Sequence, residues 1–142
     1  MSQPGYPVSR FMTANPVSVT SSCRLSEAHA LMRVMRFRHL PVVDQGELVG
    51  VLSDRDIHLQ NSMSGGSEDD LTVGDAMTPG PLSFRASYPV RDVADRMAQL
   101  RCGSAMVVSD DGKLVGIFTT VDACRALVLL CDERTSDLAK AA

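Results

Sequence analysis

The sequence predicts a mixed α/β fold built from two similar β-α-β-β-α units, and three observations support this. Residues 12–56 and 77–122 follow one pattern about 65 positions apart. Each copy contains apolar residues spaced by three and four, which is typical of one helix face. Each copy then ends in two short apolar, β-branched runs separated by turn residues. We therefore expect two repeats of one supersecondary unit, packed sheet to sheet with pseudo-two-fold symmetry.

The first unit is predicted to span residues 8–62. Residues 16–19 alternate apolar and polar side chains after a proline, which predicts a short strand. Residues 25–35 carry the apolar helix face, and residues 40–44 and 48–52 form a predicted hairpin turning near Gly46. Ser53 and Asp54 offer an N-cap for a second helix that begins at Arg55 and reaches about Ser62.

The second unit, predicted at residues 72–132, repeats this order after a Ser/Gly/Asp-rich linker at residues 63–71. A strand is expected at 81–84, a helix at 90–100 and a hairpin around Gly112. Thr119 and Thr120 cap a final helix, with residues 133–142 as its extension or a tail. A unit of about 60 residues buries too little apolar surface alone, so we expect both units to share one core.

Composition limits the class of protein. The 142 residues carry a net charge of −3 with both signs interspersed, which argues against a nucleic-acid binder. No apolar run approaches the roughly 20 residues that cross a bilayer, and the N-terminus lacks the order of a signal peptide. A cytoplasmic protein without membrane contact is therefore expected. The 4 cysteines show no CxxC pattern and no metal-site spacing with the 3 histidines, so no metal site is predicted.

A strand-to-helix junction that occurs twice is the sharpest local signal. Residues 50–56 and 116–122 each contain a glycine, a hydroxyl residue that opens a helix, and an aspartate three positions later. A helix N-terminus attracts phosphate, and Asp56 or Asp122 can accept hydrogen bonds from a ribose diol. The same residues also match a capping box, which needs no ligand. Both interpretations remain open for each copy.

With these motifs the chain resembles the CBS-domain pair, or Bateman module. The resemblance rests on the MTxxPxxV opening at Met12–Val19, the LPVVD strand at Leu40–Asp44, and the G-h-x-[ST]-x-x-D endings at Gly50–Asp56 and Gly116–Asp122. It implies a regulatory module that requires no cofactor and binds an adenosyl ligand such as AMP, ADP, ATP, S-adenosylmethionine or an NAD-type molecule. It also implies a homodimer that acts on a separate effector protein.

By position in the motifs, the resemblance assigns one ligand cleft to each repeat. The first cleft comprises Thr13, Asn15, Pro16, Val17, Ser18, His39, Leu40, Pro41, Ser53, Arg55 and Asp56. The second comprises Thr78, Gly80, Pro81, Leu82, Ala105, Met106, Thr119 and Asp122. Arg38, His39 and Arg55 are candidate phosphate partners, with a solvent-facing Arg55 as the alternative. Since Met106 replaces a strand proline and Val121 stands where the first copy has Arg55, we expect the first cleft to bind phosphate better.

Two other classes of function compete with ligand sensing. No P-loop, nucleophile–base pair or catalytic residue set is recognisable, so an enzyme is not expected. A ligand-free module that dimerises or docks on a partner through its apolar helix faces is the main alternative.

Overall fold

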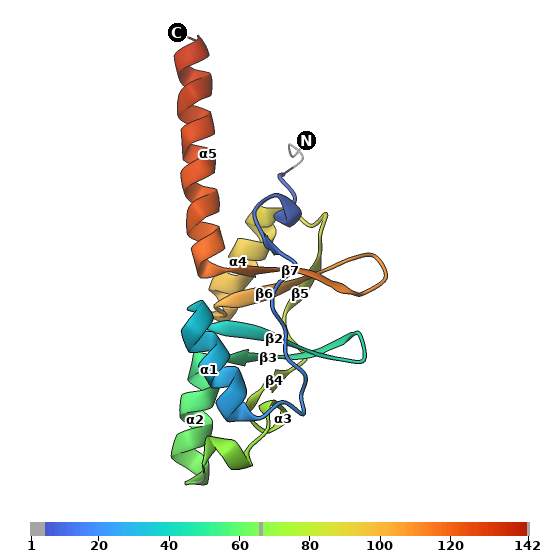
Figure 1. The fold of residues 1–142 in the computed structure, drawn as a ribbon. Coiled ribbons are helices and arrows are strands. Elements are labelled where there is room, and N and C mark those ends of the chain that lie inside the picture. Colours follow the sequence, from blue (N-terminus) through green and yellow to red (C-terminus); the bar gives the residue numbers. More distant parts are fainter. Residues whose placement is uncertain (1–4, 66, 142) are drawn as a thin grey trace.

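The structure, a computed structural model, describes residues 5–65 and 67–141 and contains two sheets, each covered by helices (Figure 1). The first sheet has the strand order β1-β7-β6-β5 and the second has the order β2-β3-β4. The strands are β1 (Thr13–Ala14), β2 (His39–Asp44), β3 (Glu47–Ser53), β4 (Thr78–Pro79), β5 (Ser83–Arg85), β6 (Ser104–Val108) and β7 (Leu114–Thr119). The predicted mixed α/β class is confirmed.

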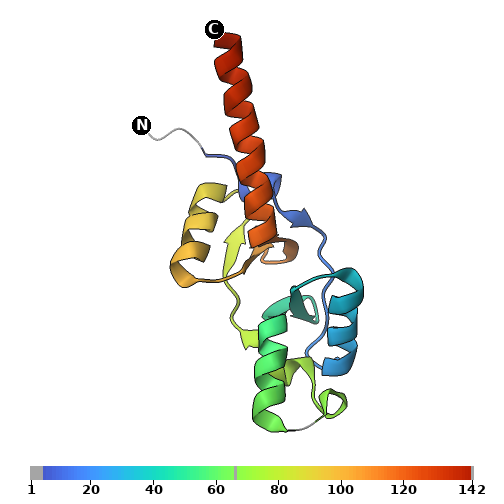
Figure 2. The same ribbon diagram turned by 90° about the vertical axis from the view of Figure 1, so that its left-hand side faces the viewer.

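Helices α1 and α2 pack with the second sheet, and α4 and the start of α5 pack with the first (Figures 1 and 2). The helices are α1 (Leu25–Met35), α2 (Asp54–Ser64), α3 (Val73–Ala76), α4 (Val90–Leu100) and α5 (Thr120–Ala141), with 3-10 turns η1 (Val8–Arg10) and η2 (Glu68–Asp70). The far half of α5 projects beyond the rest of the molecule (Figure 2). Within the described part of the chain, no helix combines the length and the apolar character needed to cross a bilayer.

Each sheet is completed by a strand from the other repeat, which the sequence did not predict. Strand β1 pairs antiparallel with β7, placing Thr13 opposite Ile117. Strand β4 pairs antiparallel with β3, placing Thr78 opposite Val51. The first short strand of each repeat therefore belongs to the sheet of the other repeat.

The prediction of a strand at residues 16–19 is wrong. Only Val19 forms an isolated bridge, to Val42. Asn15 has a left-handed φ of 50°, and Pro16 has no N–H to donate, so the chain turns away from the ladder after β1. In the second repeat the corresponding strand does form as β5, parallel to β6.

The buried apolar side chains form two clusters, whereas one shared core was predicted. The residues just before each of these exchanged strands also pack into the cluster of the other repeat. Val8 and Phe11, which lie just before β1, pack into the cluster of the second repeat. Val73, which lies before β4, packs into the cluster of the first. Each half therefore depends on the other half for part of its core, which joins the two repeats into one unit.

The segment predicted as a linker contains helical structure at both ends. Helix α2 continues to Ser64, and η2 follows at Glu68–Asp70. The Glu68 carboxylate accepts a 2.7 Å hydrogen bond from Asn61 Nδ2 and lies 2.9 Å from His29 Nδ1. These contacts fasten η2 to α1 and α2. The proposed boundaries at residues 62, 71 and 132 are not themselves tested and stay predictions.

Candidate functional site

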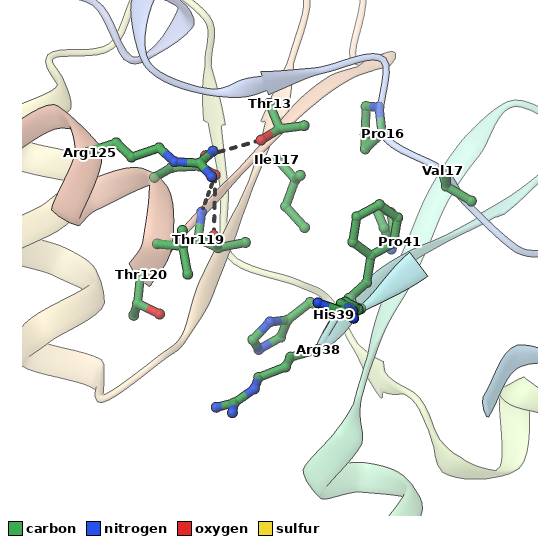
Figure 3. A pocket seen from close by; sticks show the side chains of 14 residues that line it. Thr13, Pro16, Val17, Arg38, His39, Pro41, Ile117, Thr119, Thr120 and Arg125 are labelled. Carbon is green, nitrogen blue, oxygen red and sulfur yellow. Dashed lines mark hydrogen bonds between the residues drawn. The ribbon is translucent and has the colours of Figure 1, made fainter. Parts of the chain in front are cut away.

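A cavity of about 300 Å³ lies between the two sheets, where the segment after β1, the start of β2 and the start of α5 meet (Figure 3). Its walls come from both repeats. The lining residues are Thr13, Pro16, Val17, Arg36, Phe37, Arg38, His39, Pro41, Ile117, Thr119, Thr120, Val121, Asp122 and Arg125. The volume is at the lower end of the range typical of small-molecule sites.

Asp122 forms the acidic centre of this cavity and is only 5% exposed. Its carboxylate accepts hydrogen bonds from Thr13 Oγ1 at 3.0 Å, Thr119 N at 2.9 Å and Thr119 Oγ1 at 3.2 Å. These donors compensate the cost of burying a carboxylate. They also hold the segment that contains Thr13 against the first turn of α5. The group is thus a fixed acceptor at a helix N-terminus.

The apolar walls follow from the alternation of side chains along the strands. In β7, Phe118 points into the core cluster, and its neighbours Ile117 and Thr119 line the cavity. In β2, Leu40 points into the other cluster, and Pro41 lines the cavity. Apolar side chains from both repeats therefore line one space.

Basic side chains lie along the same cavity. Arg38 and His39 stand at the start of β2, Arg125 follows Asp122 by one turn of α5, and Arg36 caps the C-terminus of α1 with a φ of 58°. The His39 ring packs on Gly103, because a Cβ at that glycine would lie 3.1 Å from the ring atoms Cε1 and Nε2. Burial lowers the pKa of His39; nearby Asp56 opposes this shift and Arg38 adds to it.

The structure regroups the residues that were assigned to the two clefts. The members of the first predicted cleft that line the cavity are Thr13, Pro16, Val17, His39 and Pro41. Their polar partners are Thr119 and Asp122, which were assigned to the second cleft. The predicted grouping of Thr13 with Asp56 is therefore not observed. The exchange of strands β1 and β4 explains the difference.

The remaining residues of the first predicted cleft lie elsewhere. The Leu40 side chain is buried in a core cluster. Asn15 and Ser18 line a separate groove of about 390 Å³ beside the two hairpin turns, where Lys113 also lies. Arg55 is exposed on the first turn of α2. Ser53 and Asp56 form the capping box of that helix, with bonds of 2.9 and 3.0 Å.

Thr78, assigned to the second cleft, donates a 3.2 Å hydrogen bond to Asp56 of the first. This contact mirrors the one between Thr13 and Asp122. Of the other residues assigned to the second cleft, Ala105 is buried in a core cluster, Leu82 packs against that cluster, and Met106 is fully buried outside both clusters. Pro81 is partly buried, and Gly80 is exposed with a φ of 60°.

Several residues that line the cavity were not assigned to a cleft from the sequence: Arg36, Phe37, Arg38 as a wall residue, Ile117, Thr120, Val121 and Arg125. Arg125 carried a usable signal, because a residue three positions after Asp122 lies on the same helix face. Arg36 carried none, since its place depends on how α1 ends.

Comparison with known proteins gives a consistent picture. The sequence model described as CBS domain matches residues 8–59 and 73–129. The chain is 33% identical over 151 residues to the CBS domain-containing protein CBSX2, chloroplastic, of Arabidopsis thaliana, covering 86% of this chain and 63% of that protein. It is 29% identical over 112 residues to an inosine-5'-monophosphate dehydrogenase of Korarchaeum cryptofilum, covering 79% of this chain and 22% of that enzyme. The chain therefore spans less than two thirds of these relatives.

Solved structures agree. CBSX2 in complex with AMP matches with a TM-score of 0.81 and 34% identity, covering 89% of this chain and 99% of that one. The CBS domain pair of protein MJ0100 in complex with 5-methylthioadenosine and S-adenosyl-L-methionine matches with a TM-score of 0.78 and 27% identity, covering 87% and 97%. With both repeats matched and the fold shared along most of its length, the chain belongs to the CBS-domain family as a tandem pair.

Proposed function

We propose that the chain is a sensor that binds an adenosyl ligand in the cavity around Asp122. The observation that carries this proposal is the buried Asp122 carboxylate, held at the start of α5 between apolar walls from both repeats. Two relatives whose structures hold AMP, or S-adenosylmethionine with methylthioadenosine, support the ligand class. The chain also matches a short portion of a dehydrogenase, which is consistent with a regulatory role for this domain.

The cavity supplies one surface for each part of a nucleoside. The adenine ring would lie between the two apolar walls, Ile117 on β7 and Pro41 on β2, with Pro16 and Val17 beside it. The ribose hydroxyls would donate to Asp122, sharing it with or displacing Thr13. A ligand of about 23–31 heavy atoms at roughly 0.3 kcal/mol per atom would gain about 7–9 kcal/mol, a dissociation constant in the micromolar range.

A thermal-shift panel of AMP, ADP, ATP, S-adenosylmethionine and NAD tests the proposal, together with mass spectrometry of any nucleotide that co-purifies. A ligand at 100 times its dissociation constant should stabilise the protein by about 2.7 kcal/mol. No response to any of these ligands would favour the ligand-free interaction module instead. Incubation with ATP, followed by assay for ADP and AMP, tests the further proposal that the chain is not an enzyme.

A second, weaker cleft is proposed at the matching position around Thr78 and Asp56. The Asp56 carboxylate accepts from Ser53 N and Thr78 Oγ1, as Asp122 accepts from Thr119 and Thr13, so both aspartates are held in a similar way. Met106, a longer and flexible side chain, occupies the position that Pro41 holds in the first repeat, and both side chains are fully buried. We therefore expect calorimetry to find one tight site per chain.

We further propose that two copies associate through their helices and that the pair acts on a separate effector protein. Large apolar side chains are exposed on α1, α2 and α5: Val34 is 79%, Met63 74% and Leu127 64% exposed. Covering such side chains favours association. Light scattering should give the mass of a dimer, and a monomer would contradict this. The cytoplasmic location stays a prediction, and the relative CBSX2 is chloroplastic.

A further inference from the structure

We infer that the cavity selects phosphorylated adenosine ligands and discriminates against S-adenosylmethionine, with Arg38 and Arg125 as the selecting residues. This inference rests on the proposed function, because it concerns the same cavity. It addresses a choice that the relatives leave open: the structure of one holds AMP, and that of another holds S-adenosylmethionine.

The two guanidinium groups come from opposite sides of the cavity. Arg38 precedes β2, and its carbonyl oxygen accepts a 3.0 Å hydrogen bond from Asp54 N, which fixes its backbone. Arg125 lies on α5, one turn after Asp122. Figure 3 shows Arg38 and His39 extending from the β2 side toward the side where Thr119, Thr120 and Arg125 lie. A ligand whose ribose reaches Asp122 would thus hold its 5' substituent near both arginines.

Arginines outnumber carboxylates among the residues that line the cavity. Asp122 is the one carboxylate among the lining residues, and its oxygens are engaged by Thr13 and Thr119. Among the residues that the structure describes, neither Arg38 nor Arg125 takes part in an ion pair. Arg36 adds a third guanidinium to the lining. Unneutralised cations that converge on a cavity repel one another and attract an anion.

The first turn of α5 adds to this field. Thr120 and Val121 line the cavity at the N-terminus of a 22-residue helix, where the helix dipole is positive. A phosphate is favoured at such a position. The sulfonium of S-adenosylmethionine carries a positive charge at the corresponding place and would be repelled by the same groups.

The internal repeat shows that the fold does not require these cations. Gly103 occupies the position of Arg38 in the second repeat, and Leu59 occupies the position of Arg125 in the first. Asp54 stands where the other repeat has Thr120, which adds negative charge at the matching cleft. By contrast, Arg36 and Arg101 both occupy left-handed helix ends, with φ of 58° and 52°, so a structural role suffices for that pair. Arg38 and Arg125 are therefore specific to the Asp122 cavity.

Calorimetry with AMP, adenosine and S-adenosylmethionine tests the inference on the wild-type protein and on the double variant Arg38→Gln/Arg125→Gln. The wild type should bind AMP at least about tenfold more tightly than the other two, the size expected for hydrogen bonds to a charged group. The double variant should lose about tenfold or more for AMP and keep adenosine within about twofold. Raising the ionic strength should weaken AMP binding to the wild type more than to the double variant. Arg96→Gln, a change at an exposed arginine of α4 that lines neither the cavity nor the proposed second cleft, is the matched control and should change nothing.

The outcomes separate this inference from the proposed function. Wild-type protein that binds S-adenosylmethionine or adenosine as tightly as AMP would overturn the inference and leave adenosyl sensing intact. An equal loss of AMP and adenosine affinity in the double variant would also overturn it, since the arginines would then act on the whole pocket. Failure of all three ligands to bind would overturn the proposed function itself. GMP bound as tightly as AMP would support the phosphate selection while contradicting an adenosine-specific site.

Discussion

The hydroxyl of Thr13 donates a 3.0 Å hydrogen bond to the carboxylate of Asp122, a residue 109 positions away in the other repeat. The matching residues Thr78 and Asp56 make the same contact at 3.2 Å, 22 positions apart. The threonine that opens each repeat thus meets the aspartate that closes the other. The cavity at Asp122 is accordingly lined by residues of both repeats.

Thr13→Val should destabilise the protein more than Thr78→Val. Asp122 is buried, so it loses a donor that water cannot fully replace, at a cost of about 1–3 kcal/mol. Asp56 is partly exposed, and water can take the place of Thr78. Urea denaturation of the two variants measures the difference, and equal losses would argue against a special role for the Thr13 contact.

A cluster at the start of the chain holds the projecting helix α5. Arg10 forms an ion pair with Glu133, and Tyr6 Oη donates to the same carboxylate at 3.2 Å. The Arg10 guanidinium also lies over the Tyr6 ring, 4.4 Å from its centroid. The side chains of the ion pair are each 39% exposed, so Glu133→Gln should cost no more than about 1 kcal/mol.

The same variant should nevertheless loosen the segment before β1. Hydrogen exchange at the amides of Phe11 and Met12, which bond to the carbonyl of Val8, should become faster in Glu133→Gln. Asp132→Asn, a change at the exposed neighbouring residue, is the control and should leave exchange unaltered. Unchanged exchange in both variants would show that η1 is held by its own packing.

Acid should destabilise the protein partly through His39. Burial lowers the folded-state pKa of His39 below its ordinary value of 6.5, with Asp56 opposing the shift and Arg38 adding to it. The unfolded chain therefore binds this proton more readily than the folded one. The stability due to neutral His39 is complete above pH 6.5 and is lost as the pH falls through the folded-state pKa.

Urea denaturation along a pH series measures this effect. Between neutral pH and about pH 5, wild-type protein should lose more stability than His39→Gln, which has no titrating ring. Parallel curves for the two proteins would mean that other groups account for the acid sensitivity.

Met106→Ala should cost about 2–5 kcal/mol, the usual range for truncating a buried methionine. The side chain is fully buried, and the backbone N–H of Met106 donates to Leu82 O at 2.8 Å. Met106→Pro introduces the residue type found at the equivalent position 41. It should destabilise the protein as well, because proline has no N–H to make that hydrogen bond. A stable proline variant would contradict this role for the Met106 amide.

The internal repeat predicted the class of fold and most elements, because helix and hairpin periodicities are local properties of the chain. It could not predict the exchange of β1 and β4, because a two-residue strand carries no mark of its partner. The motif residues do show the exchange once the structure is known. A Cβ at Gly50 would lie 2.7 Å from Met77 Sδ, and a Cβ at Gly116 would lie still closer to Met12 Sδ. Each glycine makes room for the methionine that opens the other repeat.

The sequence identified several individual residues that line the cavity, but it did not predict which of them lie together. Thr13, His39 and Pro41 were assigned to a cleft and do line the cavity. Their assignment together with Asp56 followed the order of the sequence, which the exchange of strands breaks. Arg36 could not be assigned from the sequence, because its place in the cavity wall depends on how α1 ends.

The most direct test of this account is calorimetric titration of AMP into Asp122→Asn and Asp56→Asn. Both variants keep an amide oxygen as an acceptor for the capping N–H, so each should remain folded by circular dichroism. If the cavity around Asp122 is the tight site, Asp122→Asn should weaken AMP binding by about 1.5–3 kcal/mol while Asp56→Asn leaves it nearly unchanged. Loss of AMP binding in Asp56→Asn with normal binding in Asp122→Asn would contradict the account.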